Sequence, residues 1–171
     1  MAISNATLTD VPALAALVNS AYRGENSRRG WTTEANMIDG QRIDEATLID
    51  YLTDDHTYIL KYTDTDGYLT GCVYLQKQGD KLYLGMLSVS PLLQAKGIGR
   101  QLLQAGEQHA KKLNCTSVFM TVIDSRLELI SWYERRGYQK TGEIIPLIIP
   151  EKYGVLKQPL NMLVLQKNVA D

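Results

Sequence analysis

The sequence has few of the residues from which metal sites and disulfide frameworks are built. Its 171 residues include two cysteines, two histidines and one phenylalanine. Cys72 and Cys115 form no Cys-x-x-Cys pair and have no histidine nearby, so we expect free thiols in a reducing, cytoplasmic setting. With His56 and His109 as the only histidines, a histidine-rich site is excluded, and we expect no metal.

Long apolar runs and an excess of either charge are also absent. No run approaches the roughly 18 to 20 apolar residues that cross a bilayer. The first ten residues lack the basic start and apolar core of a secretory signal. Eighteen Lys and Arg against nineteen Asp and Glu leave a net charge of -1, which argues against nucleic-acid or membrane binding through a basic surface.

The composition and the hydrophobic pattern predict one α/β domain spanning residues 1–171. The chain is 44% hydrophobic and 22% charged, as in ordinary globular proteins. Apolar spacing and turn signals predict the element order β-α-α-β-β-β-α-β-α-β-β, and therefore a mixed sheet. We expect helices near 11–22, 43–52, 99–113 and 127–138, and strands near 57–63, 68–77, 81–90, 116–123, 139–149 and 160–167.

The stretch "LLQAKGIGRQLL", residues 92–103, places two glycines directly before a predicted helix. Small residues let backbone N–H groups converge, and a helix N-terminus adds partial positive charge, so the stretch suits an anion such as a pyrophosphate. The dinucleotide fingerprint fails because Leu102 stands at its third glycine, and the P-loop fails because Lys96 precedes Gly97. A tight strand-to-helix turn without a ligand is the alternative.

Two stretches resemble a known family. "LSVSPLLQAKGIGRQLL", residues 87–103, resembles the acetyl-coenzyme A motif of the GCN5-related N-acetyltransferases (GNAT family), with Gln94, Gly97 and Gly99 at its Gln/Arg-x-x-Gly-x-Gly/Ala positions. "SRLELISWYERRGYQKTGE", residues 125–143, resembles a later motif of the same family. The resemblance covers nearly the whole chain. It implies the acyl-CoA N-acyltransferase fold, a mostly antiparallel mixed sheet flanked by helices, and an acetyl-CoA-dependent N-acetyltransferase.

The resemblance also implies where acetyl-coenzyme A binds. In the family, the strand before the glycine loop bulges and separates from its neighbour, and the pantetheine arm pairs with the freed backbone. We expect the irregularity at Gly85. Main-chain contacts are compatible with Leu87 and Val89 also serving as core residues. The expected cofactor-binding residues are Leu87, Ser88, Val89, Gln94, Ala95, Lys96, Gly97, Ile98, Gly99 and Arg100.

Tyr133 matches the family's tyrosine that protonates the departing coenzyme A sulfur and contacts the cofactor. A phenol is protonated at neutral pH and can serve as the acid; a plain core tyrosine is the competing interpretation. At Arg126 many members carry asparagine. The arginine contacts cofactor or substrate instead, or only caps the helix.

No residue stands out as the general base. Some members use a glutamate on the fourth strand, and "KLYLGMLSV" contains no carboxylate. We name Glu34 as the candidate, because the family places its acceptor-binding segment after the first helix. An acid at the start of a helix is the alternative for Glu34. Asp39, Asp124, Glu128 and a chain of waters also remain open.

The acceptor is expected to be the primary amine of a small molecule. The polar stretch "YRGENSRRGWTTEA" suggests that Arg28, Arg29 and Trp31 bind the acceptor, against the alternative of a solvated charged loop. A non-catalytic acyl-CoA sensor, a protein or peptide acetyltransferase and a longer acyl group are the other hypotheses. The family also allows a homodimer, for which these residues specify no interface.

Overall fold

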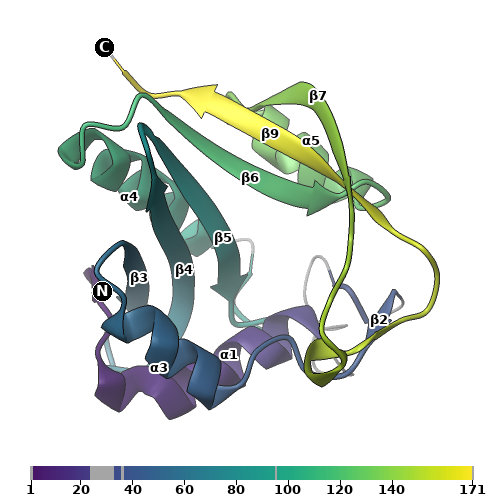
Figure 1. Ribbon diagram of the computed structural model, residues 1–171. Coiled ribbons are helices and arrows are strands. Elements are labelled where there is room, and N and C mark those ends of the chain that lie inside the picture. The colour runs from purple at the N-terminus through teal and green to yellow at the C-terminus, as the bar shows by residue number, and fades with distance from the viewer. Residues whose placement is uncertain (1, 24–32, 36, 95, 171) are drawn as a thin grey trace.

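A seven-stranded sheet forms the centre of the protein in a computed structural model that describes residues 2–23, 33–35, 37–94 and 96–170 (Figure 1). Every neighbouring pair of strands is antiparallel except β5 and β6, which run parallel. The mixed, mostly antiparallel sheet is therefore confirmed. In spatial order the strands are β1 (Ala2–Asn5), β3 (Thr57–Thr63), β4 (Leu69–Gln78), β5 (Lys81–Val89), β6 (Ser117–Ile123), β9 (Asn161–Asn168) and β7 (Gln139–Pro146).

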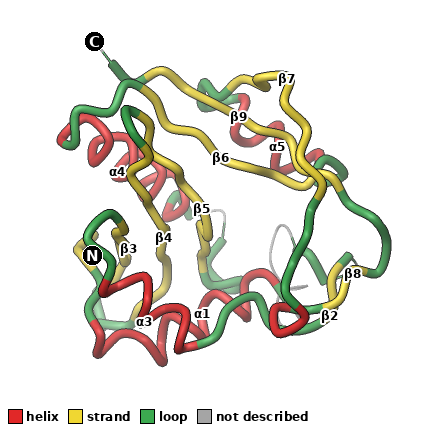
Figure 2. The backbone as a smooth tube through the Cα atoms, viewed as in Figure 1, coloured by secondary structure: helices red, strands yellow, loops and turns green. Residues whose placement is uncertain are grey.

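Helices cover both faces of the sheet (Figure 2). A short 3-10 turn, Leu8–Asp10, leads into α1 (Val11–Tyr22), which packs with α3 (Glu45–Thr53) on one face. On the opposite face, α4 (Ile98–Lys112) and α5 (Leu127–Glu134) share a second hydrophobic cluster with the sheet. Helix α3 begins two residues later than expected, at Glu45, because the Asp44 side chain caps it by accepting from Thr47 N–H at 2.8 Å.

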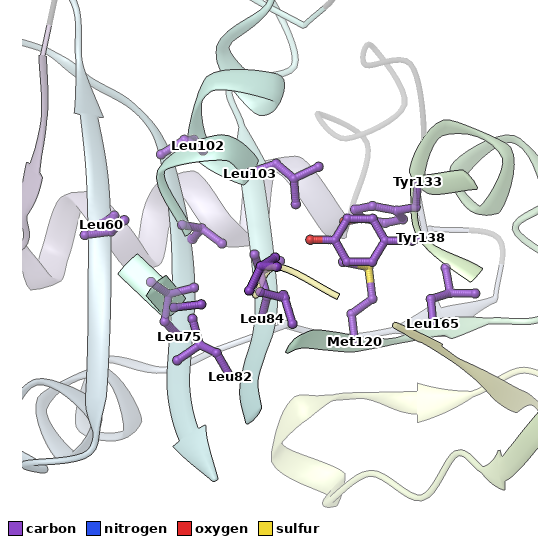
Figure 3. Close-up of a cluster of buried hydrophobic side chains, with 14 of the residues drawn as sticks. Leu60, Leu75, Leu82, Leu84, Leu102, Leu103, Met120, Tyr133, Tyr138 and Leu165 are labelled. Carbon is purple, nitrogen blue, oxygen red and sulfur yellow. The ribbon is translucent and has the colours of Figure 1, made fainter. Parts of the chain in front are cut away.

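The larger hydrophobic cluster packs α4 and α5 against the sheet strands beside the candidate site (Figure 3). Leu102 and Leu103 of α4 are fully buried with Leu84 of β5. Removing one such side chain from water stabilises the fold by about 1.5–3 kcal/mol. The rings of Tyr133 and Tyr138 lie side by side, their centroids 5.9 Å apart. The end of β5 and helix α5 thereby pack into one hydrophobic cluster.

Strand β5 is irregular next to the expected glycine rather than at it. Gly85 pairs regularly with Tyr74, but two residues of β5, Met86 and Leu87, then stand opposite the single residue Val73. Met86 is the extra residue of this bulge, and its φ of 53° is left-handed. The prediction at Gly85 was therefore wrong by one position. Glycine marks a tolerant backbone, whereas the register of β4 decides where the extra residue falls.

Strand β5 also leaves its other neighbour early. Its parallel pairing with β6 covers only Lys81–Ser117, Leu82–Val118 and Tyr83–Phe119. Beyond Tyr83 the two strands diverge (Figure 1). The last two thirds of β5, residues 84–89, consequently have one backbone edge without a strand partner among the described residues.

A second, two-stranded sheet lies beside the end of α1. It joins β2 (Ile38–Asp39) to β8 (Val155–Leu156), and the 3-10 turn Glu151–Tyr153 precedes β8. Strands of two residues are too short for an alternating apolar pattern to reveal, so the sequence analysis predicted neither β2 nor β8. Within the described ranges no helix is long and apolar enough to cross a membrane, and no three acidic, histidine or cysteine residues are grouped to hold a metal ion.

Candidate functional site

A cavity of about 440 Å³ opens between the end of β5, the start of α4 and α5. Most residues predicted to bind the cofactor line it. Lys96 is exposed and does not, and Ala95 lies outside the described residues. The predicted residues on its wall are Leu87, Ser88, Val89, Gln94, Gly97, Ile98, Gly99, Arg100, Arg126 and Tyr133.

The glycine loop presents the N-terminus of α4 to this first cavity. Gly97 caps the helix in the left-handed conformation, with φ of 83°, and no atom lies within 4 Å of where its Cβ would stand. The first helical hydrogen bond runs from Gln101 N–H to Gly97 O at 3.1 Å, so the N–H groups of residues 98–100 have no carbonyl within the helix to bind. The Gln94 side chain ties the loop to β5 by donating to Val89 O at 3.2 Å. The arrangement suits an anion.

Arginine side chains add positive charge around the first cavity. Arg100, Arg135 and Arg136 line it, and no carboxylate does among its described wall residues. The Arg136 guanidinium lies 3.8 Å from the centroid of the Trp132 ring. Burial, followed by the like charges of Arg135 and Arg100, lowers the pKa of Arg136. A polyphosphate would relieve this crowding of cations. Sequence reasoning missed Arg135, Arg136 and Trp132, since arginines near a helix end have an ordinary explanation.

The free edge of β5 forms the inner wall of the first cavity. Ser90 N–H donates to Thr70 O of the neighbouring strand, β4, at 2.9 Å. Because successive N–H groups of a strand alternate in direction, Val89 N–H points away from β4, toward the side that β6 has left. Tyr22, the last residue of α1, donates its hydroxyl to Leu87 O at 2.9 Å. Burial, the largest influence, raises the pKa of Tyr22 to about 12, so this donor stays protonated.

Tyr133 stands at the inner end of the first cavity. It is buried on α5, and its hydroxyl makes no hydrogen bond with any residue the structure describes. The adjacent Trp132 ring packs edge-on against the Tyr133 ring, at 5.1 Å between centroids. Burial raises the pKa of Tyr133 well above that of a free phenol. The phenol is therefore protonated, rigidly placed and available to a ligand.

A second cavity, of about 260 Å³, meets the first at this point. It lies between the separated halves of the sheet and is closed on one side by the segment that follows β7, including Leu147, Ile149 and Tyr153. The residues that line both cavities are Tyr22, Leu87, Arg126, Leu129 and Tyr133. A ligand group bound beside Tyr133 in one cavity therefore faces the other cavity.

Buried charges fix the boundary between the cavities. Glu34 accepts from Arg23 Nε through one oxygen at 2.9 Å and from Arg126 Nη1 through the other at 3.1 Å. All three side chains are at least 90% buried. Arg126 is also the N-cap residue of α5, but no side-chain capping bond is present. Both oxygens of Glu34, the sequence candidate for the base, thus bind guanidinium groups.

Several other predicted residues are placed away from the cavities or outside the described chain. Arg28, Arg29 and Trp31, predicted to bind the acceptor, lie outside the described residues, and so does the side chain of Asp39. Asp124 and Glu128 line neither cavity.

Comparison with known proteins identifies related sequences over part of the chain. The model of the acetyltransferase (GNAT) family matches residues 17–138. The spermine/spermidine N(1)-acetyltransferase of Bacillus subtilis is 28% identical over 65 residues, which are 37% of this chain and 43% of that protein. The chain aligns with less than half the length of the curated relatives it matches.

Solved structures match the fold along almost the entire chain. The ribosomal-protein-S18-alanine N-acetyltransferase of Escherichia coli matches with a TM-score of 0.74 and 19% identity, over 99% of this chain and 94% of that one. The structure of yncA from Salmonella typhimurium with its cofactor acetyl-CoA matches with a TM-score of 0.73 and 18% identity, over 100% and 95%. At such identities the likeness establishes the fold.

Proposed function

Because the chain belongs to the acetyltransferase (GNAT) family, we propose that it transfers the acetyl group of acetyl-coenzyme A to the primary amine of a small molecule. The observation that carries this proposal is the meeting of two cavities at Leu87 and Tyr133, beside the free edge of β5. One cavity suits a phosphorylated cosubstrate and the other a compact acceptor.

The wall of the first cavity fits coenzyme A in three respects. The N–H groups at the start of α4 suit the pyrophosphate. Arg100, Arg135 and Arg136 supply cations for the phosphate charges. The free edge of β5 offers hydrogen-bonding groups to the amides of the pantetheine arm, as an added strand would use them.

The chain's own residues would then perform the transfer as follows. Bound acetyl-coenzyme A supplies a thioester carbonyl carbon, which the neutral amine attacks. The N–H of Val89 is free to polarise the carbonyl, and Tyr22 holds the neighbouring backbone by its bond to Leu87 O. As the carbon–sulfur bond breaks, Tyr133 gives its proton to the sulfur. The proton lost by the amine nitrogen restores the phenol through solvent.

Glu34 takes no proton in this reaction. Each of its oxygens already accepts from a guanidinium, and together with Arg23 and Arg126 it ties α1 to the start of α5. We assign Glu34 a positioning role. Water then carries the amine proton away, which is one of the routes that the sequence leaves open.

Two observations support the finer points of the proposal. The second cavity is closed on one side by residues 147–153 and holds about 260 Å³, which suits a small acceptor better than a lysine on a protein surface. Cys72 and Cys115 are both free and buried, which is consistent with a reducing, cytoplasmic compartment.

The proposal is tested by incubating the protein with acetyl-coenzyme A and a panel of amines. The panel contains amino acids, polyamines, aminoglycosides and a lysine peptide, and free thiol release is followed together with the mass of the product. We expect amine-dependent thiol release with an N-acetylated small molecule. Tight coenzyme A binding without turnover of any amine would instead identify a sensor, and parallel assays with succinyl-coenzyme A test a longer acyl group.

A further inference from the structure

The second cavity carries more positive than negative charge. Its described wall includes three arginines, Arg23, Arg42 and Arg126, and a single carboxylate, Glu34. Charges of one sign in a concave site of low dielectric constant attract the opposite sign and repel their own. The composition of this wall therefore bears on which amine the cavity accepts.

Glu34 is committed to two of these arginines. It binds Arg23 and Arg126 through different oxygens. Arg23 also donates to two backbone carbonyls, those of Gln41 and Tyr153. These two cations belong to a buried network that joins α1, α5 and the segment before β8. The negative charge of Glu34 is therefore already paired with Arg23 and Arg126 inside the fold.

Arg42 differs from the other two arginines. It is half-buried, and no carboxylate among the described residues forms an ion pair with its guanidinium. That group lies over the Tyr22 ring, 5.4 Å from the ring centroid. Its backbone is fixed as well: Asn19 Oδ1 accepts from Arg42 N–H at 2.6 Å, and Asn19 Nδ2 donates to Ile43 O at 3.0 Å. Arg42 is thus a cation anchored at the cavity wall with no counter-ion from the described chain.

The rest of the second cavity is mainly apolar. The halves of the sheet and the closing segment contribute Met120, Ile123, Leu147, Ile149 and Met162. A fitting ligand therefore combines an apolar body with one anionic group. The amine must lie near Leu87 and Tyr133, where the two cavities meet.

We propose that the acetyl acceptor carries a carboxylate beside its primary amine, as an apolar α-amino acid does, and that Arg42 binds this carboxylate. The inference rests on the proposed function and deepens it by naming the substrate class. A guanidinium and a carboxylate match in charge and in geometry. The net positive charge of the wall repels a polycation such as spermidine, which is therefore excluded as an acceptor. The same positive charge disfavours the ammonium form of the bound amine, which helps to supply the neutral nucleophile.

The test compares acceptors that differ in the carboxylate alone. L-methionine, L-leucine and L-phenylalanine are assayed beside their amides and beside spermidine, with the wild-type protein, Arg42→Gln and Arg42→Lys. We expect the wild type to prefer the acids. Arg42→Gln should raise the KM for the acids about tenfold to a hundredfold, and leave the KM for the amides and for acetyl-coenzyme A within about twofold. Arg42→Lys should recover part of the loss.

A binding measurement separates this inference from the proposed function. N-acetyl-L-methionine is titrated into the coenzyme A-bound protein by calorimetry, with Arg42→Gln as the matched variant. Arg42-dependent binding without turnover of any amine would count against catalysis and support the carboxylate site. Equal turnover of acids, amides and spermidine, or acid KM values unchanged in Arg42→Gln, would overturn the carboxylate site and leave the acetyltransferase proposal standing.

Discussion

At the scale of single residues, burial decides what Tyr133 can do in the reaction. Burial raises its pKa, so the phenol keeps its proton but becomes a weaker acid. A free thiol has a pKa of about 8.5, so a thiolate in water would not take this proton. A thiolate formed inside the same cavity is desolvated too, and desolvation raises its pKa in turn. The shared burial of donor and acceptor keeps the transfer feasible.

We expect Tyr133→Phe to lower kcat about 10²- to 10⁴-fold, because the proposed general acid is lost while ring packing is kept. The dissociation constant of coenzyme A and the melting temperature should change little. The wild type should show no alkaline loss of kcat up to about pH 10, because a raised pKa keeps Tyr133 protonated there. Steady-state kinetics from pH 6 to 10 at saturating substrates measure both effects.

Tyr138→Phe is the matched control for this prediction. The Tyr138 ring is the neighbour of Tyr133, but its hydroxyl donates to Glu107 Oε1 at 3.2 Å and lines neither cavity. Losing that bond to a carboxylate should cost about 1.5–3 kcal/mol of stability and leave kcat intact. An unchanged kcat in Tyr133→Phe would remove Tyr133 from the mechanism.

At the scale of secondary-structure elements, the pairing of β2 with β8 shapes the second cavity. The pairing brings Gly40 against Gly154. The preceding residue, Tyr153, lines the second cavity, and its carbonyl accepts from Arg23. A Cβ at Gly40 would stand 2.6 Å from Gly154 Cα, and Gly40 has a φ of 104°. Both the short distance and the left-handed φ therefore require glycine at position 40.

Gly40→Ala should therefore displace the segment that closes the second cavity. We expect a loss of more than about 1–2 kcal/mol, the strain of the left-handed backbone alone. The acceptor KM should rise, and acetyl-coenzyme A affinity should hold because neither Gly40 nor Gly154 lines the first cavity. Gly67→Ala is the control: its φ is 86°, with no atom within 4 Å of its Cβ position. Equal melting temperatures and equal acceptor KM values in the two variants would contradict this account.

At the scale of the whole molecule, the sequence predicted the sheet and the glycine loop well. Period-two and period-3.6 patterns are strong over long elements such as β4 and α4, and their predicted bounds lie within a residue or two of the structure. The positions of Gln94, Gly97 and Gly99 follow from local backbone needs, so a motif can reveal them. They lie together on the first cavity.

Other features of the site depend on contacts between distant segments. Tyr22 and Leu87 are 65 residues apart, and Glu34 and Arg126 are 92 apart. Nothing local distinguishes Arg42 from a surface arginine, since its position depends on Asn19 and on the Tyr22 ring. The bulge at Met86 likewise depends on the register of β4. Such features require the three-dimensional arrangement.

We propose that the first cavity binds coenzyme A with its pyrophosphate at the start of α4, and calorimetry with coenzyme A measures this binding. The wild type, Gly97→Gln and Gly97→Glu are compared. Both variants share the left-handed strain and the added bulk at Gly97, and only the glutamate adds negative charge. We predict one site per chain in the wild type, with Gly97→Glu binding about a hundredfold or more weakly than Gly97→Gln. Equal affinity of all three proteins, or no binding by the wild type, would contradict the claim.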